Sequence, residues 1–136
     1  MTPEPSDKKI LIVDDSALSR SMLKDALEKQ GYHINLAEDG EKGLQAVIRD
    51  TPDLVLMDVV MPELNGWEAC KRIRKAALSR AVPIIIMTSK DTPQDMLQSF
   101  EVGADEFLNK PVALDELFVA ISRLLGSEKL NSEGNQ

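Results

Sequence analysis

Short, continuous apolar runs alternate along the chain with segments whose apolar residues recur at helical spacing. Three runs are apolar throughout, as expected of strands buried on both faces: Ile10–Val13, Leu54–Met57 and Ile84–Met87. Two shorter runs, His33–Ala37 and Glu106–Leu108, complete a set of five expected strands. Because each strand is followed by a segment of helical spacing, the pattern predicts an α/β fold with a parallel sheet and helices on both of its faces.

The expected helices carry apolar stripes and the residues typical of helix ends. Ser16 is placed to cap the first helix, and Thr92 followed by Pro93 indicates the start of a later one. Gly31 and Gly103 stand where helices are expected to end. The stripes comprise Met22, Leu23, Ala26 and Leu27, then Leu44, Val47 and Ile48, and finally Leu117, Ala120, Ile121, Leu124 and Leu125.

The regular pattern occupies residues 8–125, which fits one globular domain in a chain of 136 residues. Residues 1–7 and 126–136 are polar, so we expect a flexible tail at the N-terminus and a tail or the start of a linker at the C-terminus. The composition, 43% hydrophobic and 29% charged, is that of a folded domain. The net charge of −7 argues against general nucleic-acid binding and against docking on anionic lipid.

Cellular location is indicated by three simple observations. Cys70 is the single cysteine, so no disulfide can form within the chain. The polar first residues do not resemble a signal peptide, and no stretch reaches the about 20 apolar residues of a membrane span. We therefore expect a cytoplasmic protein.

Charged and hydroxyl side chains follow four of the five expected strands. Asp14 and Asp15 follow the first strand, Asp58 the third, Thr88 the fourth and Lys110 the fifth. Ligands bind at this carboxyl edge of parallel sheets. Clustered carboxylates need a cation or raised pKa values, and an all-oxygen ligand set favours a hard ion such as Mg²⁺ (or Mn²⁺). The pattern predicts a metal-assisted phosphoryl-transfer site in which Asp58, the most central carboxylate, is the nucleophile.

The same residues stand within longer motifs that together point to a known family. In chain order the motifs are Ile-Leu-Ile-Val-Asp14-Asp15-Ser16, Leu-Val-Leu-Met-Asp58-Val-Val-Met61-Pro62, Asn65-Gly66, Ile-Ile-Ile-Met-Thr88-Ser89 and Gly103-Ala104-Asp-Glu-Phe107-Leu-Asn-Lys110-Pro111. This set, specific in its order and spacing, resembles the receiver domain of two-component response regulators over residues 8–125. The resemblance implies a doubly wound, flavodoxin-like (β/α)5 fold with strand order 2-1-3-4-5.

The resemblance also implies a role for each residue of the site. Asp58 corresponds to the phosphoacceptor. Asp15, Asp58 and the backbone carbonyl of Val60 correspond to direct Mg²⁺ ligands, whereas Asp14 corresponds to a residue that acts largely through bound water. Lys110 corresponds to the lysine that pairs with a phosphoryl oxygen.

Further residues correspond to the parts that transmit the phosphorylated state. Thr88 corresponds to the switch hydroxyl and Phe107 to the switch aromatic of the family. The Lys110–Pro111 bond corresponds to one that is usually cis. Leu18 lies off the apolar stripe of its helix, so we expect it to be exposed and suggest it as a contact for the phosphodonor.

The function implied by the resemblance is a phosphorylation-dependent signalling switch in a phosphorelay. The donor would be a sensor histidine kinase or a histidine phosphotransfer protein, and an unidentified output protein or domain would bind the face around helix 4, strand 5 and helix 5. The chain would be no enzyme beyond Mg²⁺-dependent self-phosphorylation and slow self-dephosphorylation. We expect no direct nucleic-acid or membrane partner, and a monomer or a phosphorylation-dependent dimer.

Three other interpretations remain open at this point. A Mg²⁺-dependent phosphohydrolase would also use an aspartyl nucleophile, but such enzymes of the haloacid-dehalogenase type want a second acid where this chain has Val60. A purely structural relative of receiver domains would not need Asp14, Asp15, Asp58 and Lys110 together. The chain could also be the excised receiver of a larger multidomain regulator.

Overall fold

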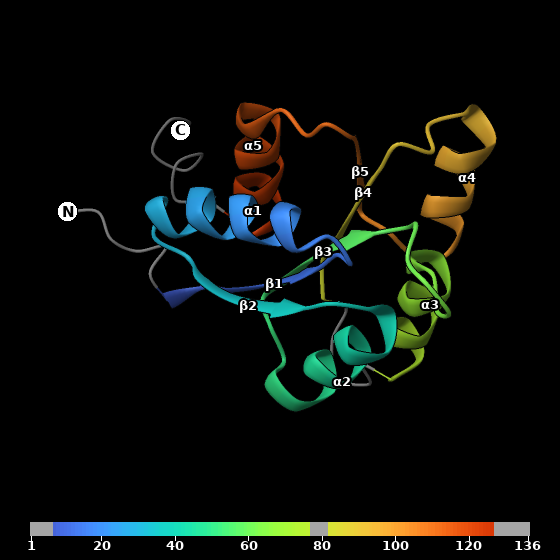
Figure 1. Ribbon diagram of the computed structural model, residues 1–136, viewed down its shortest axis with the longest axis horizontal. Coiled ribbons are helices and arrows are strands. Elements are labelled where there is room, and N and C mark those ends of the chain that lie inside the picture. Colours follow the sequence, from blue (N-terminus) through green and yellow to red (C-terminus); the bar gives the residue numbers. More distant parts are fainter. Residues whose placement is uncertain (1–6, 77–81, 127–136) are drawn as a thin grey trace.

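The structure is a computed structural model that describes residues 7–76 and 82–126. Within these residues, five parallel strands form one sheet in the order β2-β1-β3-β4-β5 (Figure 1). The strands are β1 (Lys9–Val13), β2 (His33–Ala37), β3 (Leu54–Asp58), β4 (Ile84–Thr88) and β5 (Glu106–Asn109), and the helices are α1 (Ala17–Lys29), α2 (Gly40–Asp50), α3 (Gly66–Ala76), α4 (Pro93–Glu101) and α5 (Leu114–Leu124). The predicted fold class and strand order are confirmed.

The tails expected at the two ends of the chain fall almost entirely outside the described residues. Of the N-terminal tail, expected over residues 1–7, the structure describes Asp7, and of the C-terminal tail, expected over 126–136, it describes Gly126. Both tails therefore stay predictions. In the described part of the chain, no helix has the length and apolar character needed to cross a membrane.

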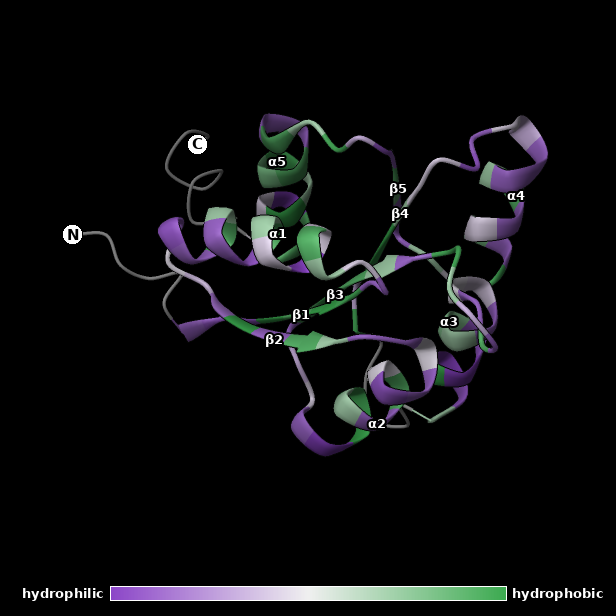
Figure 2. Ribbon diagram, in the orientation of Figure 1, coloured by the Kyte–Doolittle hydropathy of each residue, from purple (hydrophilic) through white to green (hydrophobic). Residues whose placement is uncertain are grey.

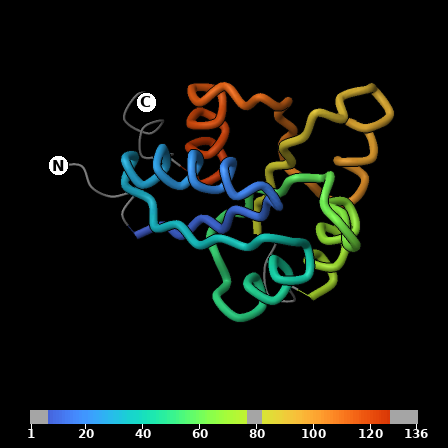
Figure 3. The backbone as a smooth tube through the Cα atoms, viewed as in Figure 1, coloured from blue at the N-terminus to red at the C-terminus, as the bar shows by residue number. Residues whose placement is uncertain are grey.

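The centre of the sheet is the most completely buried part of the molecule. Every residue of β3 and β4 is buried, whereas β2 at the edge is mostly exposed. Figure 3 follows the chain from the blue first strand, which lies between the cyan second strand and the green third strand. The continuous apolar runs are thus explained by burial on both faces, as the sequence pattern predicted.

Two apolar cores lie on opposite faces of the sheet. One joins α1 and α5 to the sheet through residues such as Ile12, Leu27 and Ile121. The other joins α2 and α3 to it through residues such as Val47 and Ile73. Figure 1 shows α1 and α5 on one side of the strands and α2 and α3 on the other, and Figure 2 shows the green strands enclosed by helices with purple outer faces. This arrangement leaves the carboxyl edge of the sheet free for a site.

Two residues of the expected helix stripes are not in the core. Met22 is 61% exposed and Ile48 is 58% exposed, so their assignment to buried stripes was wrong. On α2, the helix surface nearest to the sheet carries the small residue Gly43 and not Ile48. A Cβ at Gly43 would lie 2.8 Å from a methyl carbon of Val13. Because α2 packs so closely on the sheet at Gly43, Ile48 at the side of the helix stays in solvent.

The predicted helix ends are confirmed. The Ser16 hydroxyl accepts a hydrogen bond from Ser19 N at 3.2 Å at the start of α1. Thr92 and Asp95 form a reciprocal capping box at the start of α4. A positive φ of 104° at Gly103 ends α4 in the left-handed conformation that glycine adopts without strain. These local signals set where each helix leaves the sheet edge.

Helix α4 is attached to α3 by a hydrogen bond to a buried serine. The indole Nε1 of Trp67 donates to Ser99 Oγ at 2.9 Å, and Ser99 Oγ donates in turn to Asp95 O at 3.0 Å. Ser99 is 0% exposed, so its hydroxyl forms hydrogen bonds to protein groups in place of water. The contact fixes α4 against the first turn of α3.

Removing this hydroxyl should destabilise the domain. We expect Ser99→Ala to lower the free energy of unfolding by about 1–2 kcal/mol, because the partly buried indole N–H of Trp67 loses its acceptor. The measurement is urea unfolding followed by Trp67 emission, which should also change in the folded baseline. Gln98→Ala, an exposed change on the same helix, is the matched control. Equal unfolding midpoints for the two variants would contradict the expectation.

Candidate functional site

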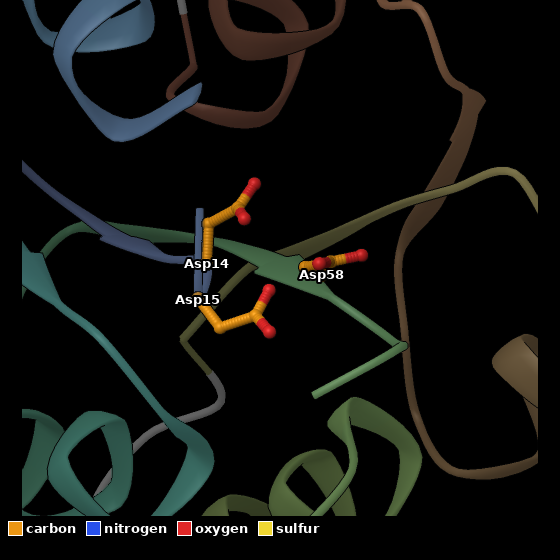
Figure 4. A group of neighbouring side chains, drawn as sticks. All are labelled: Asp14, Asp15 and Asp58. Atoms are coloured by element: carbon orange, nitrogen blue, oxygen red, sulfur yellow. The ribbon is translucent and has the colours of Figure 1, made fainter. Parts of the chain in front are cut away.

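Three carboxylates meet at the carboxyl edge of the sheet. Asp58 is the last residue of β3, and Asp14 and Asp15 directly follow β1, which is the neighbour of β3 in the sheet. One carboxylate oxygen from each of the three lies within 4.8 Å of the others (Figure 4). Asp14 and Asp58 are buried, whereas Asp15 is exposed. The predicted clustering of these acids is therefore observed.

The three carboxylates differ in how their oxygens are used. Both oxygens of Asp14 accept hydrogen bonds from the protein, including one from Ser16 N to Oδ1 at 2.9 Å. Asp15 faces solvent. This set of carboxylate oxygens fits a hard divalent cation such as Mg²⁺, because such ions prefer oxygen ligands and retain several waters.

Lys110 provides the positive charge at the same edge. Its Nζ lies 2.9 Å from Asp14 Oδ2 and 3.5 Å from Asp58 Oδ2. Burial acts to lower the pKa of Lys110, but the hydrogen bond to Asp14 and the charges of both aspartates outweigh it and raise that pKa above its usual value. The lysine is therefore fully charged at neutral pH. The Lys110–Pro111 peptide bond is cis, as expected.

The environment of Asp58 disfavours its negative charge. Burial is the largest effect, and together with the nearby Asp14 it raises the pKa of Asp58 from 3.8 to about 6. The charge of Lys110 and the backbone N–H of Val60 act in the opposite direction. A cation or a further positive charge at this edge would relieve the penalty, so the site is built to attract one.

The loop that follows Asp58 returns closely against it. Gly66 N donates to Val59 O at 2.9 Å, and a Cβ at Gly66 would lie 2.0 Å from Asp58 O. No side chain larger than hydrogen fits there without moving the main chain of the candidate phosphoacceptor. Gly66 therefore fixes where Asp58 stands relative to the start of α3.

The remaining predicted residues take different positions around the site. Thr88 is buried at the end of β4, where its Oγ1 accepts a hydrogen bond from Lys90 N at 3.1 Å. Phe107 is half-buried and packs against the core beneath α2 and α3. Val60 is 56% exposed and Leu18 is 70% exposed, as expected for Leu18.

Two neighbours of the site were missed by sequence reasoning. Ser19 Oγ donates to Asp14 Oδ2 at 2.8 Å, and Arg20 Nη1 donates to Asp14 O at 2.7 Å. Both residues lie in the first turns of α1, one turn past the capping Ser16. That spacing, on a helix that begins directly after the acidic pair, is the signal that could have identified them.

Comparison with known protein families and sequences supports this interpretation. The family model described as the response regulator receiver domain matches residues 10–122. The chain is 39% identical over 121 residues to the response regulator MprA of Mycobacterium leprae, covering 89% of this chain and 52% of that protein. It is 36% identical over 125 residues to MprA of Mycobacterium ulcerans, covering 92% and 53% respectively. The chain thus spans about half the length of these relatives.

Solved structures agree with the sequence comparison. The chemotaxis protein CheY4 of Vibrio cholerae has a TM-score of 0.81 and 31% identity, covering 86% of this chain and 98% of that one. The receiver domain of the sensor histidine kinase PA1611 of Pseudomonas aeruginosa, solved with a magnesium ion in its active-site cleft, has a TM-score of 0.81 and 30% identity, covering 88% and 98%. The fold, the acidic edge and these matches agree, and the chain belongs to the receiver domain family of two-component response regulators.

Proposed function

We propose that this domain is a signalling switch that accepts a phosphoryl group on Asp58 from a histidine kinase or a histidine phosphotransfer protein. The observation that carries the proposal is the placement of one buried carboxylate, Asp58, within 3.5 Å of Lys110 Nζ and beside the acidic pair at a single sheet edge. In phosphoryl transfer the protein mainly positions the groups and stabilises charge. This edge supplies a nucleophile and a fixed positive charge.

The transfer step uses the ionised Asp58 carboxylate as nucleophile. One of its oxygens attacks the phosphorus of the phosphohistidine, so that a P–O bond forms while the P–N bond breaks. The imidazole nitrogen leaves with the electron pair of that bond. Lys110 Nζ stands 3.5 Å from Asp58 Oδ2 and is the group that pairs with a phosphoryl oxygen. Attack of water on phosphorus later releases inorganic phosphate and restores the carboxylate.

A divalent cation is part of the proposed site. Asp15, Asp58 and the Val60 carbonyl would hold Mg²⁺ or Mn²⁺, and Asp14 would contact it through water. When bound, the ion would neutralise charge on the phosphoryl oxygens. The site then catalyses only its own phosphorylation and slow dephosphorylation, and no external substrate is turned over.

The phosphodonor is proposed to dock beside α1. A cleft of about 660 Å³ next to Lys110 is lined by apolar residues that include Leu18, Met22, Pro111 and Leu114. Leu18 and Met22 are exposed, so a helix of the donor could cover them while its phosphohistidine reaches Asp58. Leu18 is the contact that we propose for this partner.

Output is proposed to follow from Thr88 and Phe107. When Thr88 turns toward the phosphoryl group, the space it leaves admits Phe107, which has no hydroxyl to satisfy when buried. The face formed by α4, β5 and α5 would then present a different surface to an output protein or domain. We also propose that the protein is cytoplasmic and is a monomer or a phosphorylation-dependent dimer. It would have no direct nucleic-acid or membrane contacts, and it would act alone or within a longer regulator.

The test is phosphorylation by a small-molecule donor. Protein incubated with Mg²⁺ and acetyl phosphate should gain the mass of one phosphoryl group and change its Trp67 emission, whereas Asp58→Asn should do neither. Intact-mass spectrometry and fluorescence measure the two effects. A phosphoryl group found on the Asp58→Asn variant would overturn the assignment. Repeated turnover of small phosphate esters would favour the phosphohydrolase instead, although Val60 stands where that class carries its second acid.

A further inference from the structure

The carboxylate of Asp14 accepts three hydrogen bonds although no part of the residue reaches solvent. Asp14 is 0% exposed, and Ser16 N donates to its Oδ1. Its other oxygen, Oδ2, is shared by two donors: Ser19 Oγ at 2.8 Å and Lys110 Nζ at 2.9 Å. Ser19 and Lys110 thus share one oxygen of a buried carboxylate.

Lys110 stands closer to Asp14 than to Asp58. Its Nζ is 2.9 Å from Asp14 Oδ2 but 3.5 Å from Asp58 Oδ2. If Lys110 Nζ moves toward a phosphoryl oxygen on Asp58, its bond to Asp14 Oδ2 lengthens and weakens. A buried carboxylate oxygen deprived of its donor is costly, and more so when it carries charge. A second donor that stays on Asp14 Oδ2 lowers this cost.

We infer that Ser19 is a positioning residue whose hydroxyl holds Asp14 Oδ2 and so allows Lys110 to turn from Asp14 to the phosphoryl group on Asp58. The inference rests on the proposed function. With Ser19 in place, part of the charge on Asp14 is already compensated, and the release of Lys110 costs less. Without it, Asp14 holds Lys110 more tightly in the unphosphorylated state.

The local structure makes this effect separable from a general loosening of the site. Arg20 Nη1 donates to Asp14 O at 2.7 Å, and Ser16 N holds Asp14 Oδ1. Removing the Ser19 hydroxyl therefore leaves the main chain and one carboxylate oxygen of Asp14 restrained. The change falls on Oδ2 alone, which is the oxygen that contacts Lys110.

The experiment compares two affinities by titration calorimetry: that for Mg²⁺ alone, and that for beryllofluoride, a phosphoryl mimic, at saturating Mg²⁺. Ser19→Ala should weaken beryllofluoride binding by about threefold to tenfold, part of the value of one hydrogen bond to a charged group. Its Mg²⁺ affinity should not fall, because Ser19 contacts Asp14 Oδ2 and none of the proposed direct ligands of the ion. Ser19→Thr, which keeps the hydroxyl, should restore beryllofluoride affinity to within about twofold of the wild type. Ser21→Ala, an exposed serine of the same helix, should change neither affinity.

Each outcome separates one explanation from another. Wild-type beryllofluoride affinity in Ser19→Ala would overturn the role of Ser19 while leaving the proposed function intact. An equal loss of both affinities would also overturn it, because that pattern indicates structural damage to the site. If the wild type and Ser21→Ala themselves bind neither Mg²⁺ nor beryllofluoride, the proposed function has failed instead.

Discussion

Asp58→Asn is expected to stabilise the metal-free domain while abolishing its phosphorylation. Burial and the nearby Asp14 raise the pKa of Asp58 from 3.8 to about 6, so its ionised form is strained at neutral pH. Each pKa unit corresponds to about 1.4 kcal/mol, which sets an upper bound of ~3 kcal/mol for the gain. We expect urea unfolding in the presence of EDTA at pH 7.5 to show an increase of about 1–3 kcal/mol in the free energy of unfolding.

The pH dependence gives this expectation its sign. The folded wild type binds the Asp58 proton more tightly than the unfolded chain, so the contribution of Asp58 to the free energy of unfolding falls as the pH rises from about 4 to about 6. The advantage of Asp58→Asn should therefore be absent below pH 4, where the carboxyl is protonated in both states, and complete above pH 6. Added Mg²⁺ should stabilise the wild type more than the variant. A constant difference between the two proteins from pH 3.5 to 7.5 would refute the explanation by charge.

The second large effect is expected at Arg74 of α3, which contacts main-chain carbonyls at two other places in the chain. Its Nη1 donates to Val82 O at 2.6 Å, its Nε donates to Gly103 O at 3.0 Å, and its Nη2 pairs with Asp105 Oδ2 at 3.0 Å. Arg74→Met keeps the apolar stem but removes all of these donors. We expect the free energy of unfolding to fall by about 2–4 kcal/mol, because two carbonyls lose their partners.

The neighbouring Arg72 offers a matched control. Arg72 is exposed on the same helix and pairs with Glu68 one turn away, at 3.3 Å. Arg72→Met should therefore change stability by no more than about 0.5 kcal/mol. Thermal and urea unfolding of the two variants would check the contrast. Equal changes in the free energy of unfolding for Arg74→Met and Arg72→Met would contradict the expectation. The carbonyl contacts of Arg74 would then stabilise the domain no more than a surface ion pair does.

The topology and the acidic edge were predictable because both depend on patterns within single strands. Continuous apolar runs such as Leu54–Met57 indicate burial on both faces, and this property belongs to a parallel sheet enclosed by helices. Because the strands are parallel, the residues that follow them necessarily meet at one edge. Asp14, Asp15 and Asp58 could therefore be brought together from the sequence before any distance was known.

Other features depend on how elements dock against one another, and a single segment does not contain that information. Met22 looks like a core residue in the stripe of α1, but the helix settles with this side chain in solvent. Arg74 looks like a solvated charge on an amphipathic helix, yet it reaches Gly103, 29 residues later in the chain. The direction of the Ser19 hydroxyl likewise follows from the docking of α1 beside Asp14.

The close return of Gly66 against Asp58 has a mechanical consequence. The main chain of Gly66 packs directly against the Asp58 carbonyl, and Gly66 N is bonded to Val59 O, so the two ends of the segment between them are held together. We therefore expect the start of α3 to move little when Asp58 is phosphorylated. Displacement is expected on the opposite side, toward β4 and α4, and amide hydrogen exchange should rise or fall there while the amide of Gly66 stays protected.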